Sequence, residues 1–308
     1  MVANCMRGFR SLHRGAPVFL SWLVLALSPA ARADESGHLL PLWRVAGGDN
    51  HLYLLGSVHL LRESDHPLPS AVYAAYDDVD TLFMEIDMDA VDPIATQSLV
   101  NELAIIHDGR QLRDLMGPEP YSEAESLARR LNIPIAMLAD AEPWYAAITV
   151  DALMLMRIGF SPEHGIERQL AERAAQDGKA INGLETERQQ LEILDGLSPE
   201  AQRILLLQSL ADGIDIEKTM DDLVAAWRYG DVRQLEEDLL SEIEVYPELF
   251  DTLVVRRNSN WVEQIVSLLE QRRNALIVVG TLHLVGEHGV PALLRDRGYS
   301  VQQLHQSD

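Results

Sequence analysis

The chain has 308 residues and a formal net charge of −23, which argues against nucleic acid and anionic membrane surfaces as partners because both would repel it. Its one cysteine, Cys5, lies in an N-terminal segment that we expect to be removed, so the remaining protein has no disulfide framework and must depend on an apolar core. The roughly 275 residues that then remain suffice for one large α/β domain.

The first segment, residues 1–33, is predicted to be a signal peptide. Three arginines precede an apolar segment over 16–29, and Ala31-Arg32-Ala33 supplies a cleavage site after Ala33. That apolar segment is shorter than the roughly 30 Å core of a membrane requires, and no later segment is long and apolar enough to span one. Cleavage removes four arginines and no acid, which leaves 21 basic and 48 acidic residues, or −27. We therefore expect a periplasmic or secreted protein with no stable membrane insertion after cleavage.

The mature chain is expected to open with a hairpin of two strands, 42–46 and 51–55, joined by a Gly-rich turn. The second strand ends in Gly56-Ser57-Val58-His59, and a short helix follows near residue 70. A histidine that comes just after a buried strand and a glycine lies at the sheet edge where ligands of α/β proteins gather.

An apolar strand over residues 81–87 follows and places Glu85 and Asp87 at its carboxyl end. Consecutive parallel strands usually lie side by side, so we expect these acids near His59. Glu85 is the stronger candidate for a functional role, because Asp87 is equally well explained as an acid of the following loop.

Residues 91–272 are predicted to form a helical insertion that is interrupted by strands near 133–138 and 179–184. The second of these strands delivers Glu185 at its carboxyl end. Helical periodicity of the apolar residues predicts helices within four segments, 91–131, 143–159, 162–176 and 198–272.

Residues 276–284 repeat the pattern of residues 52–60: four apolar residues, Gly, a small hydroxyl residue, an apolar residue, His and Leu. The bare Gly-x-x-His spacing also arises by chance, and two structural histidines are the alternative. The shared context favours a functional pair, His59 and His283, at one edge of the sheet.

A helix over 290–297 and a last strand over 299–304 complete the expected elements. The predicted fold class is α/β, with a mixed, mostly parallel sheet built from both ends of the chain and a helical insertion between them.

Five motifs occur in a fixed order: Gly56-Ser57-Val58-His59, Met84-Glu85-Ile86-Asp87, Gly183-Leu184-Glu185-Thr186, Arg257-Asn258 and Gly280-Thr281-Leu282-His283-Leu284-Val285-Gly286. In this order they resemble the TraB/PrgY/GumN family, which includes the animal Tiki proteins, and the resemblance covers nearly all of residues 34–308. It implies an α/β fold distantly similar to erythromycin-esterase-type and ChaN-type domains. Through the Tiki branch it also implies a metalloprotease activity dependent on a divalent transition metal such as manganese or cobalt.

The family's motif residues can be assigned one by one to positions in this sequence. His59 and His283 match the family's two Gly-x-x-His histidines, and Glu85 matches its acid after the second strand. Glu167 departs from the pattern, because many relatives carry Asp at that position, which puts a role for residue 167 in doubt. The substrate does not transfer.

Imidazole and carboxylate side chains together suit zinc, manganese or cobalt, and the sequence does not choose among them. His59, His283 and Glu85 supply either three ligands, or two ligands and a base. Glu185 is our first choice for a further ligand or base, with an acid that favours a helix N-terminus as the alternative.

Four further residues are candidates for supporting roles. Ser57 and Thr281 are placed to orient the imidazoles by hydrogen bonds. Arg257 and Asn258 lie on a predicted helix before the last motif, where they either bind a substrate carbonyl or carboxylate or form an ordinary surface salt bridge.

The sequence has no His-Glu-x-x-His helix, no Gly-x-Ser-x-Gly elbow and no P-loop. The leading prediction is a periplasmic metal-dependent hydrolase that acts on peptide or protein substrates. The alternative is a non-catalytic periplasmic module that binds a peptide, a metal or an iron compound, and a structural accessory of an envelope assembly is a third reading. The sequence does not determine whether the protein forms a homo-oligomer.

Overall fold

The computed structural model describes residues 39–305, apart from 48 and 242, and these residues fall within one compact unit, Ser36–Asp308. The predicted signal peptide over 1–33 and its cleavage site lie outside the described residues. Over the part that is described, no helix combines the length and the apolar character needed to cross a membrane.

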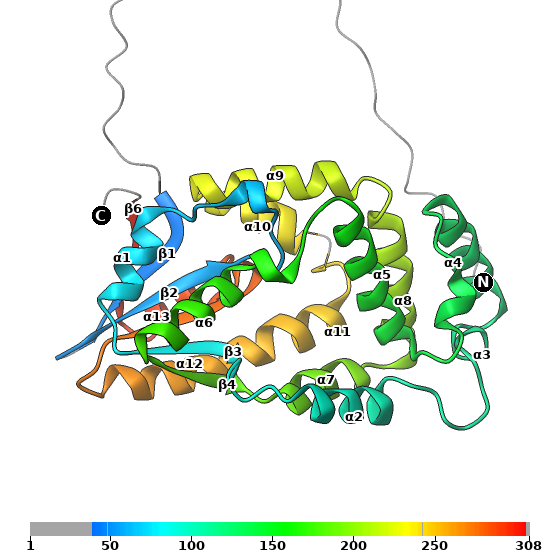
Figure 1. The fold of residues 1–308 in the computed structure, drawn as a ribbon, viewed down its shortest axis with the longest axis horizontal. Coiled ribbons are helices and arrows are strands. Elements are labelled where there is room, and N and C mark those ends of the chain that lie inside the picture. Colours follow the sequence, from blue (N-terminus) through cyan, green and yellow to red (C-terminus); the bar gives the residue numbers. More distant parts are fainter. Residues whose placement is uncertain (1–38, 48, 242, 306–308) are drawn as a thin grey trace, which may run out of the picture. The chain divides into compact units, whose positions relative to one another are not determined.

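A six-stranded mixed sheet lies at the centre of this unit (Figure 1). Its strands are β1 (Leu39–Ala46), β2 (His51–Ser57), β3 (Thr81–Ile86), β4 (Ala180–Glu185), β5 (Ala275–Gly280) and β6 (Ser300–His305). They lie in the order β4-β3-β5-β2-β1-β6, with β4, β3, β5 and β2 parallel and β1 antiparallel to both of its neighbours. The expected hairpin and the mostly parallel sheet built from both chain ends are confirmed.

Strand β5 separates β2 from β3, so the expectation that β2 and β3 lie side by side is wrong. Every residue of β5 is buried, and its central run, Leu276-Ile277-Val278-Val279, offers no polar side chain to solvent on either face. A strand of this composition is most stable in the middle of a sheet whose two faces are both covered. As a result, β5, which precedes His283, runs between β2, which precedes His59, and β3, which carries Glu85.

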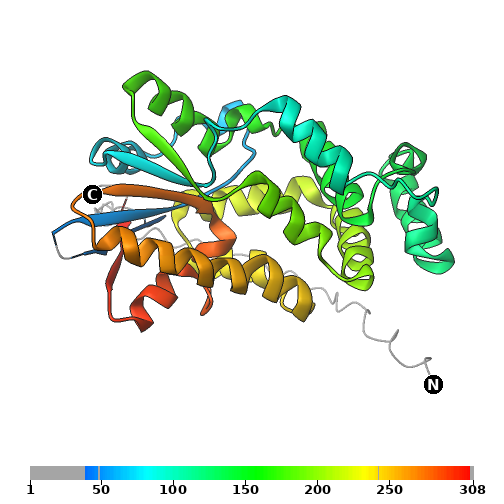
Figure 2. The same cartoon turned by 90° about the horizontal axis from the view of Figure 1, so that it is seen from below.

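Helices cover both faces of the sheet, and Figure 2 shows α6 in green and α12 in orange on opposite sides. One face packs against α1 (Ser70–Asp77), α6 (Ile166–Asp177), α9 (Ile216–Tyr229) and α10 (Val232–Leu240). The other packs against α12 (Arg256–Leu269) and α13 (Val290–Asp296). Buried Trp227 of α9 donates its Nε1–H to the carbonyl of Gly56 at 2.7 Å, which fixes the first layer to the end of β2.

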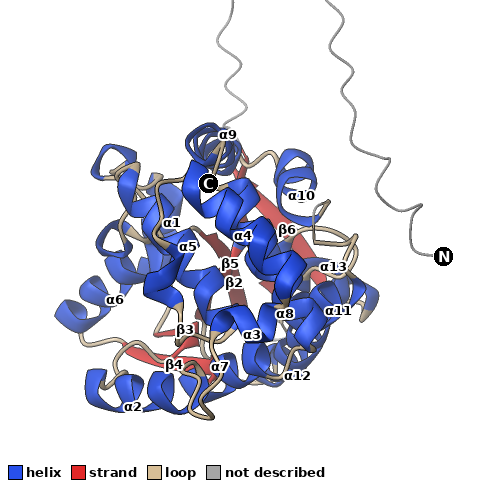
Figure 3. Cartoon of the chain, turned by 90° about the vertical axis from the view of Figure 1, so that its right-hand side faces the viewer, coloured by secondary structure: helices blue, strands red, loops and turns tan. Residues whose placement is uncertain are grey.

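The remaining α-helices lie mostly beside the sheet in Figure 1 and in front of it in Figure 3. They are α2 (Pro93–Leu103), α3 (Leu112–Met116), α4 (Pro118–Arg130), α5 (Pro143–Arg157), α7 (Glu187–Asp195), α8 (Pro199–Asp212) and α11 (Pro247–Phe250). Five of them begin at a proline, where the missing N–H is not needed. Helices α3, α4, α5 and α8 bury apolar side chains against one another and form a separate core.

One of the two strands expected inside the insertion is present and the other is not. The strand near 179–184 is β4, but residues Ile135–Leu138 form a 3-10 helix instead of a strand. Pro134 lacks the N–H that a strand ladder would use. The buried residues Ile135 and Leu138 are three positions apart, which matches the period of a 3-10 turn and not the alternation of a strand.

Candidate metal-binding site

The strand register brings the predicted site residues to one edge of the sheet. Ser57 of β2 pairs with Gly280 of β5, and Met84 of β3 pairs with Val278. An added Cβ on Gly280 would lie 3.2 Å from Oε1 of Glu85, 3.4 Å from Nε2 of His59 and 3.7 Å from Cδ2 of His283. These three side chains therefore converge on a space that is open because residue 280 has no side chain.

His283 lies on a 3-10 turn, Thr281–Leu284, and is 4% exposed. Its Nδ1 is 2.7 Å from Oδ1 of Asn258. The Nδ2 of Asn258 donates to the carbonyls of His283 and His288 at 3.3 and 2.8 Å, so its Oδ1 must face the ring. Because this oxygen can only accept, Nδ1 carries the proton and Nε2 presents its lone pair to the site. Burial lowers the pKa of His283 to about 3, so the ring is neutral.

His59 is oriented in the same way by an acid. Its Nδ1 lies 2.6 Å from Oε1 of Glu167, in the first turn of α6, and its Nε2 lies 3.9 Å from Oε1 of Glu85. Ser57 donates its hydroxyl to the same oxygen of Glu167. An added Cβ on Gly165 would come within 2.0 Å of the His59 carbonyl, so this glycine lets α6 approach. The Glu167 carboxylate raises the pKa of His59 to about 9, so the free ring is protonated at neutral pH and must release the proton on Nε2 before that nitrogen can bind a metal.

Glu85 is 12% exposed and ionised. Burial opposes ionisation, but the positive charges of His59 and Arg257 and the Gly280 N–H outweigh it and hold the pKa of Glu85 below its usual value. Its Oε1 accepts from the Gly280 N–H at 2.8 Å, and its Oε2 accepts from Arg257 at 2.7 Å and from Gln190 at 3.1 Å. Each oxygen therefore has a donor of its own.

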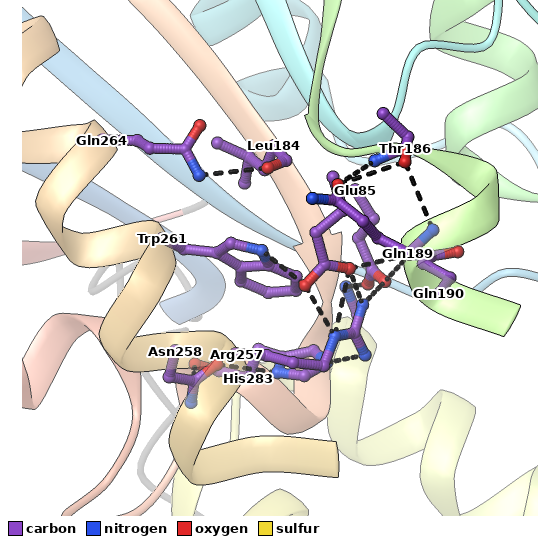
Figure 4. Close-up of polar contacts among 12 residues, drawn as sticks. Glu85, Leu184, Thr186, Gln189, Gln190, Arg257, Asn258, Trp261, Gln264 and His283 are labelled. Carbon is purple, nitrogen blue, oxygen red and sulfur yellow. Dashed lines mark hydrogen bonds and ion pairs between the residues drawn. The ribbon is translucent and has the colours of Figure 1, made fainter. Parts of the chain in front are cut away.

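Arg257 lies beside Glu85 and His283 (Figure 4) and forms a largely buried ion pair with Glu185. Arg257 donates from Nε to Oε1 of Glu185 at 3.0 Å and from Nη2 to Oε2 at 2.8 Å. The guanidinium carbon lies 4.7 Å from the Trp261 ring centre, and Trp261 donates its Nε1–H to Oε1 of Glu185 at 3.0 Å. Arg257 is thus part of the site and does not form the surface salt bridge that was the alternative.

A cavity of about 630 Å³ opens on His59 and Glu85. Its wall combines site residues with apolar and polar side chains from β3, the loop after it, the 3-10 helix Pro162–His164, α6 and α7: Met84, Ile86, Met88, Pro162, Glu163, Glu167, Arg168 and Gln190. The volume is sufficient for part of a ligand of peptide size next to the converging side chains.

The donor set suits a divalent transition metal. Metal–ligand bonds of about 2.0–2.2 Å place two ligands of one ion roughly 3–4 Å apart, and the distance of 3.9 Å between His59 and Glu85 lies in that range. Each imidazole has its Nδ1 fixed by a partner, a pattern typical of metal ligands. As the side chains stand, the described residues include no group of three that could hold an ion, and Arg257 contacts both Glu85 and His283.

Several supporting roles differ from those expected. Ser57 contacts the Glu167 carboxylate instead of an imidazole, and Thr281 donates to the Ser57 carbonyl at 2.9 Å. The groups that orient the rings are Glu167, whose role the sequence left in doubt, and Asn258, for which the sequence left substrate binding and an ordinary surface contact open. A clue to Glu167 was its position two residues after a glycine at a helix start.

Two other residues lie outside this cluster. The carboxylate of Asp87 accepts the N–H groups of Asp89 and Ala90 at 3.0 and 3.3 Å, so Asp87 is a loop acid. The ring of His288 packs 5.5 Å from that of Phe250, and its side chain is 41% exposed.

Comparison with known proteins gives a match to the sequence profile of the TraB/PrgY/gumN family over residues 41–303. The chain is 23% identical over 248 residues to the uncharacterized protein YbaP of Escherichia coli, covering 80% of this chain and 89% of YbaP. It is 23% identical over 305 residues to the metalloprotease TIKI2 of Danio rerio, covering 81% of this chain but 58% of TIKI2. A metalloprotease TIKI homolog of Amphimedon queenslandica is 38% identical over 77 residues, covering 24% and 13% of the two chains.

No solved structure matches the chain, so the expected similarity to erythromycin-esterase-type and ChaN-type domains stays a prediction. The family profile, in contrast, spans most of the sequence, from β1 to β6. It includes both Gly-x-x-His segments and the strand that carries Glu85. The chain therefore belongs to the TraB/PrgY/gumN family.

Proposed function

We propose that this protein is a metal-dependent hydrolase that cleaves peptide bonds in peptides or proteins after export to the periplasm. The observation that carries the proposal is the convergence of His59, His283 and Glu85 on the space at Gly280. The names of the TIKI relatives as metalloproteases support the choice of a peptide bond as the target.

The proposed ligands are His59, His283 and Glu85, and an ion held there would polarise a substrate carbonyl and lower the pKa of water. The chain's own groups prepare the site for this chemistry. Asn258 and Glu167 fix the two rings so that each Nε2 faces the site. The Gly280 N–H holds Glu85 in place.

Two other charged groups complete the proposed site. Arg257 is a permanent positive charge at its edge, where it can stabilise the negative charge that develops on a carbonyl oxygen during hydrolysis. Both oxygens of Glu185 accept from Arg257, and one accepts from Trp261. These contacts support a role for Glu185 in holding Arg257, while its role as a further ligand or base stays a prediction.

The test compares metal content and peptide hydrolysis across variants of the purified protein. His59→Ala, Glu85→Ala and His283→Ala are expected to lower the hydrolysis of an unfolded protein substrate by at least about a hundredfold. The two histidine variants should also lose bound metal, as measured by mass spectrometry of the elements. His107→Ala is the matched control, because His107 is exposed and contacts only the Asn101 carbonyl.

Two results would overturn the proposal. If the three variants keep full metal content and activity, the site is elsewhere. If the wild-type protein retains a peptide, a metal or an iron compound but releases no product, the non-catalytic binding module is correct.

A further inference from the structure

Arg257 contacts two of the three side chains that we propose as metal ligands. Its Nη2 donates to Oε2 of Glu85 at 2.7 Å, and its Nη1 lies 3.2 Å from Nε2 of His283. The side chain is 13% exposed, so these contacts are largely shielded from water. A guanidinium does not lose its proton in proteins, and this positive charge is therefore fixed inside the site.

The contact with His283 and a metal bond to the same nitrogen exclude each other. Nδ1 of the neutral ring carries the proton that it donates to Asn258, so Nε2 has a single lone pair to offer. That lone pair faces Nη1 of Arg257. A divalent ion at this position would also meet strong repulsion from a guanidinium at hydrogen-bond distance.

The contacts with Glu185 do not involve the proposed ligands. Glu185 accepts from both Nε and Nη2 of Arg257, and the guanidinium stacks on Trp261. Trp261 in turn holds Oε1 of Glu185 at 3.0 Å. Arg257 can therefore give up Glu85 and His283 and still keep a two-point ion pair and an aromatic neighbour, all supplied by β4 and α12.

We propose that Arg257 competes with the metal ion for Glu85 and His283. Metal loading requires the guanidinium to leave these two groups, and Glu185 with Trp261 retains it at the edge of the site. The competition makes the site bind an ion less tightly than its ligands alone would do. This inference rests on the proposed function, since it presupposes that the three residues bind metal.

Calorimetric titration of the purified protein with Zn²⁺ alone tests the competition. Arg257→Met removes the competing charge, and we expect the Kd for Zn²⁺ to fall about tenfold. Arg168→Met is the matched control, because Arg168 lines the same cavity but pairs with Glu172 at 2.7 Å. It removes one positive charge near the site without freeing Glu85, so its Kd should stay within about twofold of the wild-type value.

Arg257→Lys covers the case in which Arg257→Met does not fold, a point that circular dichroism checks. A lysine keeps the charge but lacks the planar fork that contacts Glu85, Glu185 and His283 together. We expect its Kd for Zn²⁺ to lie between those of the wild-type protein and Arg257→Met, and a Kd equal to or weaker than the wild-type value contradicts the competition.

Glu185→Gln separates the retaining role of Glu185 from a role as a metal ligand. If Glu185 acts through Arg257, its loss strengthens the hold of Arg257 on Glu85, and Zn²⁺ binding weakens. The same substitution should then have no effect in the Arg257→Met protein. A ligand would instead weaken binding in both backgrounds, and that result overturns the inference.

The outcomes also separate this inference from the proposed function. If Arg257→Met binds Zn²⁺ no more tightly than Arg168→Met does, the competition is wrong while the hydrolase proposal stands. If every folded variant, including the wild-type protein, binds neither Zn²⁺ nor Mn²⁺, the proposed function fails and the inference fails with it.

Discussion

At the scale of single residues, two side chains from helices orient the imidazole rings of the candidate site. Asn258 and Glu167 each contact the Nδ1 of one imidazole, at 2.7 and 2.6 Å. Each contact keeps a proton on Nδ1, so Nε2 is the nitrogen of each ring that can bind an ion, in the case of His59 after its second proton has left. The buried Oε2 of Glu167 has no hydrogen-bond partner among the described residues, which keeps all polar contacts of this acid on its other oxygen.

Asn258→Ala is expected to weaken metal binding without removing a proposed ligand. The substitution takes away the acceptor that fixes His283, and loss of such a partner typically costs 10- to 100-fold in metal affinity. Titration with Zn²⁺ measures the change. Ser259→Ala is the control, because Ser259 is the next residue of α12 and its hydroxyl contacts only the Val255 carbonyl. Equal affinities for the two variants would contradict the assignment.

The sequence predicts the location of the main groups better than their partners. His59, Glu85 and His283 are found together because each lies at or just after the carboxyl end of a strand that local composition identifies. Glu167 and Asn258 lie far from their histidines in the chain, and their contacts depend on how α6 and α12 pack against the sheet. Such packing is a tertiary property that no local pattern encodes.

At the scale of secondary-structure elements, α5 and α8 meet at a partly buried carboxyl group. Asp151 of α5 accepts from the Ser209 hydroxyl of α8 at 2.9 Å. Burial raises the pKa of Asp151 to about 6, and the nearby Asp212 carboxylate acts in the same direction. Since the unfolded chain has the ordinary value of about 3.9, the folded state binds this proton more tightly.

Asp151→Asn is expected to change the pH dependence of stability. The stabilising contribution of protonated Asp151 is complete below about pH 4 and is lost as the pH rises through 6. The asparagine variant has no such loss, so at pH 8 it should be more stable than the wild-type protein by on the order of 2 kcal/mol. Urea unfolding at pH 4 and pH 8 measures the difference.

Asp80→Asn provides the comparison for Asp151→Asn, because Asp80 is exposed at the start of β3. It should leave the free energy of unfolding within about 0.5 kcal/mol of the wild-type value at both pH values. If the free energy of unfolding of Asp151→Asn at pH 8 equals that of the wild-type protein, the ionised Asp151 carboxylate does not destabilise the folded state and the prediction is wrong.

The predicted elements that failed at this scale failed for identifiable reasons. Residues 133–138 are apolar enough for a strand, but Pro134 and the three-residue spacing of buried positions give a 3-10 helix. Strand order cannot be obtained from adjacency in the chain, because β5 is more apolar than β2 or β3 and takes the centre of the sheet. The mixed, mostly parallel sheet was predicted from the apolar strands of both chain ends. Within residues 91–272, the helices α6, α9, α10 and α12 cover the faces of the sheet.

At the scale of the whole molecule, the candidate site joins segments from both ends of the chain. His59 follows β2 and His283 follows β5, with the helical insertion between them in sequence. A bound ion would cross-link these segments in the folded state but not in the unfolded chain. Binding of this kind stabilises the fold by RT ln(1 + [L]/Kd).

Metal is therefore expected to raise the thermal midpoint of the whole molecule. Zn²⁺ at about 100 times its Kd should add about 2.7 kcal/mol, which corresponds to roughly 5–10 °C for a domain of this size. Removal of the ion with a chelator should reverse the shift. His283→Ala should abolish the metal-dependent increment, whereas His107→Ala should keep it. An increment that persists in His283→Ala would place the stabilising ion elsewhere.

The central place of β5 also governs the order of assembly during synthesis. Until residues 275–280 leave the ribosome, β2 can pair only with β1 and β3 only with β4, so each lacks one of its two neighbours in the finished sheet. The backbone groups at these unpaired edges can then pair with other chains, so chaperones that bind the nascent chain would protect it from aggregation at this stage. A nascent polypeptide that stops before β5 lacks both the strand between β2 and β3 and His283, so the sheet and the candidate site are completed only when the last part of the chain has been made.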